Sequence, residues 1–273
     1  MKSIIVTGSF DDFRSHHMRL LDEASKLGDL HVLLLSDMAL RTLNGVSPKL
    51  TQEERLYLLQ SIRYVKDVTI IDKPLEQEIS LPNLSFQVHM WVVDNSSDTP
   101  SKRSYCQIHH IEYHPIDRND LYTFSDPNYD PIDDTTGRKK VIVTGCFDWF
   151  HSGHVRFFEE VAELGDLYVV AGSDRNVRLL KGEGHPFFPQ NIRWYMIQAV
   201  RFVKQAMIST GSGWMDAEPE VAVIKPDIYA VNEDGDKPDK RLFCQEHGIQ
   251  YVVLKRLPKE GLPKRQSTDL RGF

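Results

Sequence analysis

The sequence has few cysteines, no excess of positive charge and no long apolar run. Its three cysteines, Cys106, Cys146 and Cys244, form no CxxC pair, so neither a disulfide framework nor a zinc site is expected. A formal net charge of −6 argues against broad nucleic-acid binding. No apolar run reaches the roughly 18 residues that mark a membrane helix, so no integral membrane segment is expected. The N-terminal residues read as a strand and a turn without a cleavage site, which predicts a cytoplasmic protein.

Two common phosphate-binding signatures are also absent. The sequence contains neither GxxxxGK[ST] nor GxGxxG, which removes the main support for P-loop and dinucleotide-binding proteins. No Ser-His-Asp or Cys-His arrangement suggests a covalent nucleophile, and we interpret Cys146 as a packing residue. With 273 residues, of which 41% are hydrophobic, the chain is long enough for two globular domains.

The chain repeats itself. Residues 3–37 match residues 140–174 without a gap at 18 of 35 positions, including the shared Val-Thr-Gly and Leu-Gly-Asp-Leu segments. Residues 90–113 match residues 228–251 at ten of 24 positions. The period is too long for a solenoid, and each half has the size of a domain. We therefore predict an internal duplication with domains at 1–124 and 139–273, joined by a linker over 125–138 that is rich in Pro, Asp and Thr.

Each half alternates short apolar strands with amphipathic helices. In the second half the pattern predicts strands at Lys140–Thr144, Leu167–Ala171, Ala206–Ser209, Asp227–Val231 and Tyr251–Leu254, and helices at Ser152–Leu164, Gln190–Val203 and Asp239–His247. Such alternation predicts an α/β fold: two tandem Rossmann-like domains, each a doubly wound parallel sheet. Ligands of such sheets bind beyond the carboxyl ends of the strands, where Gly145–His154 and Asn232–Asp236 are expected.

The strongest chemical signal lies between the first strand and first helix of the second half, where the sequence reads GCFDWFHSGH from Gly145 to His154. Two imidazoles three residues apart at a helix start can meet one ligand from the same side. The helix N-terminus adds free N–H groups and a positive dipole, which suits a phosphate. Imidazoles can also stabilise the charge that develops on a leaving pyrophosphate.

This segment resembles the HxGH signature of the nucleotidyltransferase superfamily, and the following ELGD-strand-GSD resembles its cytidylyltransferase branch. The resemblance continues through Leu180–Gly182, Pro189–Arg193 and Arg265–Arg271, the last of which is similar to the family's ISTT-type motif. The tandem arrangement, together with the TQEER segment from Thr51 to Arg55, resembles the ethanolamine-phosphate cytidylyltransferases. Two departures are Asp269, which replaces the second Thr of ISTT, and Asn232-Glu233-Asp234, which only loosely matches the GDD-type segment.

The resemblance implies a role for each matching residue. His151 and His154 would hold the nucleotide phosphates and the transition state, while Lys181 would neutralise phosphate charge. Arg193 would bind the phosphate of the second substrate. Asp148 would lie near a Mg²⁺ that accompanies the nucleotide, or would serve as a local hydrogen-bond acceptor in its turn. The other nucleotide-binding residues implied are Gly145, Cys146, Phe147, Gly153, Asn232, Glu233, Ser267, Thr268 and Arg271.

The implied reaction transfers CMP from CTP to a phosphorylated small alcohol such as phosphoethanolamine, and it releases pyrophosphate. An adenylyltransferase that uses ATP and a sugar phosphate is the nearest alternative, because residues 173–182 resemble the heptose-phosphate adenylyltransferases about as well. A non-catalytic nucleotide sensor built on the same fold is a second alternative. The reaction would be an in-line displacement, in which a preformed phosphate anion needs no base and catalysis is mostly positioning and electrostatics.

The first half keeps the frame but not these residues. Arg14 and His16 stand where the second half has His151 and Gly153, and Asn44 aligns with Lys181. Residues 1–136 carry a net charge of −8, whereas the rest carries +2, so a triphosphate should prefer the second half. We therefore expect the first half to be a non-catalytic partner. Because related single-domain enzymes pair as dimers, the two halves are expected to form a pseudo-dimer within one chain, with a homodimer of chains as a further expectation.

Overall fold

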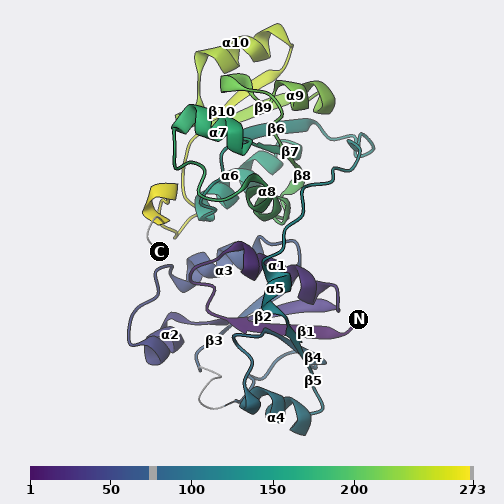
Figure 1. The fold of residues 1–273 in the computed structure, drawn as a ribbon, viewed down its shortest axis with the longest axis vertical. Helices are drawn as coiled ribbons and strands as arrows, with labels where there is room; N and C mark the ends of the chain where they lie inside the picture. The colour runs from purple at the N-terminus through teal and green to yellow at the C-terminus, as the bar shows by residue number, and fades with distance from the viewer. Residues whose placement is uncertain (74–78, 271–273) are drawn as a thin grey trace. The chain divides into compact units, whose positions relative to one another are not determined.

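The computed structural model describes residues 1–73 and 79–270 (Figure 1). The chain forms two compact units, Met1–Thr123 and Phe124–Phe273. Unit 1 contains, in order, β1 (Ser3–Gly8), α1 (Ser15–Ser25), β2 (Asp29–Leu35), α2 (Asp37–Asn44), α3 (Gln52–Gln60), β3 (Val65–Ile71), β4 (Met90–Asp94), α4 (Pro100–Ile108), β5 (Glu112–Ile116) and α5 (Arg118–Leu121).

Unit 2 repeats this order with small additions. It contains β6 (Lys140–Gly145), α6 (Ser152–Ala162), β7 (Asp166–Ala171), α7 (Asp174–Lys181), α8 (Gln190–Gln198), β8 (Val203–Ile208), α9 (Glu218–Ile224), β9 (Ile228–Asn232), α10 (Pro238–Glu246) and β10 (Gln250–Leu254). Short 3₁₀ turns lie at Gly213–Met215, Glu233–Gly235 and Ser267–Leu270. None of the helices in the described part of the chain is both long and apolar enough to cross a membrane.

Each unit is built on one parallel five-stranded sheet. The strand orders are β3-β2-β1-β4-β5 in unit 1 and β10-β9-β6-β7-β8 in unit 2, so the two sheets have the same topology. In unit 2 the chain runs from β6 to β7 on one side and later returns to β9 on the other side. The order therefore reverses between β6 and β9, and ligands of doubly wound sheets bind at such a switch point. The predicted fold class, two tandem Rossmann-like units, is confirmed.

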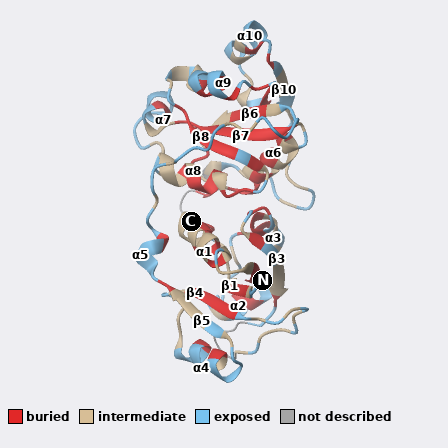
Figure 2. Ribbon diagram, turned by 90° about the vertical axis from the view of Figure 1, so that its right-hand side faces the viewer, coloured by how far each residue is buried: buried red, intermediate tan, exposed pale blue. Residues whose placement is uncertain are grey.

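Alternate residues of the unit 2 strands face opposite layers of helices. Val141 and Val143 of β6 belong to a core with Phe158 of α6 and Ile197 of α8, whereas Ile142 belongs to a core on the other face. That second core includes residues of α9 and α10. Buried residues therefore concentrate in the strands, as Figure 2 shows in red for β6 and β7. A sheet covered on both faces needs nearly continuous apolar strands, as the sequence provides.

Two predicted elements have boundaries that differ from the structure by more than two residues. The helix predicted at Gln190–Val203 corresponds to α8, which ends at Gln198. Two consecutive turns follow it, closed by backbone hydrogen bonds from the N–H groups of Val200 and Val203. The strand predicted at Ala206–Ser209 accordingly begins earlier, at Val203. Helices α7 and α9, which the sequence pattern did not assign, fill the connections on either side of α8 and β8.

The acidic segment 125–138, predicted as a linker, contacts unit 2 closely. The Ile208 N–H donates to the hydroxyl of Tyr129 (2.9 Å), and the Gln205 side-chain amide donates to the Asp130 carbonyl (2.9 Å). The Thr136 hydroxyl donates to Asp166 (2.7 Å). Because β8 is the edge strand of its sheet, the segment shields an edge that would otherwise be open to another strand.

The glycine of the repeated Leu-Gly-Asp-Leu turn has a steric explanation. The Asp166 N–H donates to the Lys139 carbonyl, and the Asp29 N–H donates to the Lys2 carbonyl, each at 2.8 Å. These bonds bring the backbone so close that a Cβ on Gly165 would lie 2.1 Å from the Lys139 oxygen. Glycine is therefore required in this turn.

We expect Gly165→Ala to lower the free energy of unfolding by about 1–3 kcal/mol, the usual cost of overpacking. Urea denaturation of the full chain measures this loss. The control is Gly235→Ala, because the nearest atom to a Cβ there lies 3.9 Å away. Equal stability of the two variants would contradict the steric explanation.

Candidate active site

A cavity of about 250 Å³ opens at the switch point of unit 2. Its walls come from the end of β6, the start of α6, the end of α7 and the turn after β9. The lining residues predicted from the sequence are Gly145, Cys146, Phe147, Asp148, His151, Gly153, His154, Lys181, Asn232 and Ser267. The structure thus brings together segments that lie more than 100 residues apart.

The two histidines form a stacked pair at the start of α6. His151 is the N-cap residue, and its Nδ1 accepts a hydrogen bond from the Gly153 N–H (3.0 Å). The rings of His151 and His154 are 3.9 Å apart and nearly parallel. A Cβ on Gly153 would lie 2.9 Å from the His151 ring, so glycine at this position allows the imidazole to fold over the helix end.

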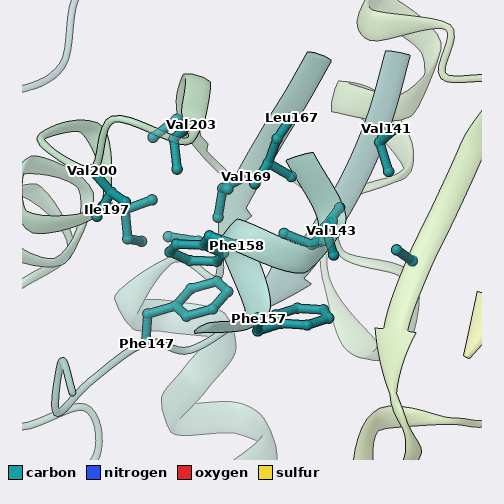
Figure 3. Close-up of a cluster of buried hydrophobic side chains, with 14 of the residues drawn as sticks. Val141, Val143, Phe147, Phe157, Phe158, Leu167, Val169, Ile197, Val200 and Val203 are labelled. Carbon is teal, nitrogen blue, oxygen red and sulfur yellow. The ribbon is translucent and has the colours of Figure 1, made fainter. Parts of the chain in front are cut away.

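Phe147 packs against His154 of this pair. Its φ is +52°, and its buried ring lies 5.3 Å from both His154 and Phe158. A Cβ on Gly145 would lie 2.9 Å from the Phe147 ring. Figure 3 shows Phe147 and Phe158 side by side beneath Val169 of β7. The turn before α6 is therefore anchored in the hydrophobic core.

His154 is neutral at physiological pH. Burial lowers its pKa well below the usual value, and the nearby His151, Arg256 and Lys181 lower it further. A neutral imidazole carries one N–H donor and one acceptor nitrogen. The neutral His154 can thus donate one hydrogen bond to a phosphate oxygen.

Lys181 lies at the end of α7, beside Cys146. Burial raises the pKa of the Cys146 thiol, and the charge of Lys181 only partly offsets that rise. A thiol with a raised pKa is a poor nucleophile at neutral pH. These observations favour a packing role for Cys146 and leave the Lys181 charge available to a ligand.

Asp148 fixes a nearby loop by hydrogen bonds. Its carboxylate accepts hydrogen bonds from the N–H groups of Phe187 and Phe188, all at 2.9 Å. No group of three or more His, Cys, Asp or Glu side chains within residues 1–73 and 79–270 could hold a metal ion. A Mg²⁺ held mainly by substrate phosphates needs only one or two carboxylates from the protein. A direct contact between Asp148 and Mg²⁺ stays a prediction.

Arg193 differs from the expectation that it binds a substrate phosphate. It is 1% exposed and its guanidinium is occupied by protein acceptors. These are the carbonyls of Phe188 (2.9 Å), Cys146 (2.6 Å) and Gly172 (2.7 Å) and the carboxylate of Asp174 (2.8 Å). A guanidinium with this set of partners ties loops together and has little capacity left for a ligand.

The remaining predicted residues vary in position. Glu233 is exposed and is absent from the cavity lining, although its neighbours Asn232 and Asp234 line it. Ser267 reaches the cavity, Thr268 lies in the 3₁₀ turn that follows, and Arg271 lies outside the described residues.

Two cations in the lining were not predicted from the sequence. Arg256 forms an ion pair with Asp234, and it also donates to the Arg265 carbonyl (3.3 Å). Lys240 projects from α10. The repeat offered a signal for Lys240, because the first half has Lys102 at the matching position.

Unit 1 preserves the scaffold of this site but not its chemistry. Arg55 matches Arg193, and it donates to the carbonyls of Leu50, Ser9 and Leu35 and to the carboxylate of Asp37. Asp11 matches Asp148 and likewise accepts from two loop N–H groups, those of Lys49 and Leu50. Arg193 and Asp148 therefore have structural roles that do not depend on the histidine pair.

The fold and the cavity define a nucleotidyltransferase of the HxGH type. A sequence model of the family described as cytidylyltransferase-like matches residues 5–109 and 142–257. The chain belongs to this cytidylyltransferase-like family, and both of its units are covered by the match.

Three relatives are each similar to less than half of the chain. The FAD synthase of Ferroglobus placidus is 34% identical over 125 residues, which cover 45% of this chain and 78% of that protein. The FAD synthase of Thermococcus kodakarensis is 36% identical over 131 residues, 44% of this chain and 82% of that protein. The bifunctional protein HldE of Campylobacter concisus is 38% identical over 100 residues, 36% of this chain but 21% of that protein. The chain thus spans about a fifth of HldE.

We expect Arg193→Met to cost about 3–5 kcal/mol of stability, because it breaks the ion pair of a buried guanidinium with Asp174 and leaves three carbonyls, that of Gly172 fully buried, without a donor. The matched variant Arg55→Met should have a similar cost in unit 1. Hydrogen exchange of the full chain, read separately for peptides of the two units, measures where protection is lost. Unchanged protection around Cys146 and Gly172 in Arg193→Met would contradict this structural role.

Proposed function

We propose that unit 2 transfers CMP from CTP to the phosphate of a small phosphorylated alcohol of the phosphoethanolamine type. The observation that supports this proposal is the meeting of a stacked histidine pair, a helix N-terminus and two lysines, Lys181 and Lys240, in one cavity. Within the described residues neither lysine forms an ion pair, so their charge is available to phosphates.

In the proposed reaction an oxygen of the acceptor phosphate forms a bond to the α-phosphorus of the nucleotide. The bond from that phosphorus to the bridging oxygen breaks, and pyrophosphate leaves with the electron pair. No proton must be removed from the nucleophile, because a phosphate is already an anion at neutral pH. The protein therefore needs donors and positive charge rather than a general base.

The histidine pair and the start of α6 supply the donors. The neutral His154 donates one N–H, and the first turn of α6 adds backbone N–H groups with its positive dipole. Lys181 offsets the charge that accumulates on the leaving phosphates. Asp148 would lie near a Mg²⁺ that accompanies the nucleotide, and this ion would supply further positive charge to the phosphates.

A second candidate is adenylyl transfer from ATP to a phosphorylated acceptor such as a sugar phosphate. The names of the relatives favour it, since FAD contains an adenylyl group and proteins named FAD synthase recur among the matches. The family description and the tandem arrangement favour CTP. Both candidates use the same cavity and the same bond-breaking step, and they differ in the base and the acceptor.

We propose that unit 1 is catalytically silent. Arg14 replaces the capping imidazole, and His16 stands where unit 2 has Gly153. The ring of Tyr122, which follows α5, stacks on His16 at 5.1 Å. In unit 2 the matching region at the start of α6 lines the open cavity. An aromatic side chain of unit 1 thus covers the position at which unit 2 would admit a phosphate.

We expect His154→Ala to lower turnover by about 10²-fold or more, the scale for losing one donor to a developing charge. The assay follows pyrophosphate release with CTP, ATP, GTP and UTP against phosphoethanolamine, other phosphorylated alcohols and sugar phosphates. The matched control is His17→Ala in unit 1, which should retain activity. Highest activity with ATP would establish the second candidate. Nucleotide binding without pyrophosphate release from any pair would favour a sensor.

The silent first unit predicts one nucleotide site per chain. Titration of the full chain with the preferred triphosphate in a calorimeter should give a stoichiometry near one. His154→Ala should weaken that single site, whereas Arg14→Ala should leave it unchanged. Two equivalent sites would contradict the proposed division between the units.

A further inference from the structure

Lys240 occupies an unusual position in the cavity of unit 2. It is the third residue of α10, and its half-buried side chain reaches residues of β6 and β9. Its Nζ lies 3.4 Å from the Thr144 hydroxyl and 5.6 Å from the centre of the Tyr229 ring. The Thr144 and Tyr229 hydroxyls bond to each other at 2.8 Å. The two groups that contact the Lys240 Nζ here, the Thr144 hydroxyl and the Tyr229 ring, are therefore neutral.

The carboxylates near Lys240 have other partners. Asp234 forms an ion pair with Arg256, and Asp148 accepts from loop N–H groups. Asp216, which attracts the Lys240 charge from a distance, accepts a hydrogen bond from the Ser209 hydroxyl. Within the described parts of the chain Lys240 forms no ion pair, and burial lowers its pKa. A partly buried cation without a counterion is costly to the free protein.

The two units place the ammonium group of this lysine differently. Lys102 of unit 1 matches Lys240 and places its stem in the same way, with its Nζ 5.8 Å from the Trp91 ring. Its ammonium group is buried and donates to the Ser97 carbonyl at 2.8 Å. Gly235 of unit 2 stands at the position of Ser97, and it lines the cavity together with Lys240. The lysine ammonium group is thus buried in unit 1, whereas in unit 2 the lysine lines a cavity.

We propose that Lys240 is an anion-binding residue of the active site and contacts a phosphate group of a substrate directly. This inference rests on the proposed function of unit 2. The group it would contact is a phosphate oxygen, which belongs either to the triphosphate donor or to the acceptor phosphate. In both cases the substrate supplies the counterion that the protein lacks.

The test compares Lys240→Met with the wild-type full chain. Methionine retains most of the apolar stem and removes the charge. Lys237→Met is the control, because Lys237 is exposed on the same turn and its loss changes the net charge equally. We expect Lys240→Met to have an unchanged or higher Tm without ligand, since an unneutralised buried charge is gone. A purely structural lysine would instead lower the Tm when replaced.

Calorimetry then identifies the phosphate. CTP, ATP and pyrophosphate probe the donor side, and phosphoethanolamine and inorganic phosphate probe the acceptor side. We expect at least one of these probes to bind tenfold or more weakly to Lys240→Met, and its ligand-induced rise in Tm to shrink accordingly. Lys237→Met should bind every probe as the wild type does. Weakened CTP and pyrophosphate binding assigns Lys240 to the donor, and weakened binding of phosphoethanolamine or inorganic phosphate alone assigns it to the acceptor.

Two outcomes would overturn the inference in distinguishable ways. If the wild type binds these probes and Lys240→Met binds them equally well, Lys240 is no phosphate ligand and the proposed function survives. If the wild type binds none of them, the proposed function fails, and the role of Lys240 fails with it.

Discussion

The active-site loops of unit 2 depend on the buried guanidinium of Arg193. Its hydrogen bonds join the turn after β6, the end of β7, the start of α7 and the loop before α8. The turn after β6 leads directly into the histidine pair, so the position of both imidazoles is linked to this one side chain. An arginine suits the task because its five donors have fixed directions and its charge is permanent. Loops held in this way can present ligand-binding groups with little freedom to move.

The internal duplication separates this scaffold from the chemistry it supports. The arginine, the loop-holding aspartate and the phenylalanine with positive φ recur in both units, as Arg55, Asp11 and Phe10 in unit 1. The capping imidazole and the glycine beside it occur only in unit 2. These two depend on each other, since any side chain at position 153 would collide with the folded-over ring of His151. Unit 1 has neither of them, since Arg14 and His16 stand at the two positions.

The sequence predicted the fold well because its signals were local. Apolar strands and amphipathic helices repeat in register across the two halves, and the HxGH segment marks the start of α6. The contacts made by the far ends of side chains were harder to predict. Arg193 lies in a segment that resembles a substrate-binding motif, but it donates to the carbonyls of Cys146 and Gly172, 47 and 21 residues earlier, as well as to the nearby Phe188 carbonyl. Lys240 was missed for the converse reason, because an ordinary lysine near the start of a helix becomes part of the site only when β6 and β9 are neighbours. The pattern of strands and helices alone does not show that β6 pairs with β9.

Charge and burial act together in this cavity. Burial keeps His154 neutral, so the free protein does not carry two adjacent imidazolium groups beside Lys181 and Arg256. A phosphate bound next to the His154 ring would raise the pKa of His154, because it brings negative charge close to the ring and to the neighbouring cations. Unit 1 shows the other solution. Burial lowers the pKa of His17 to about 3, and the neighbouring His16 is stacked under Tyr122. There two adjacent histidines are covered by an aromatic ring, whereas in unit 2 a differently spaced histidine pair lines a cavity.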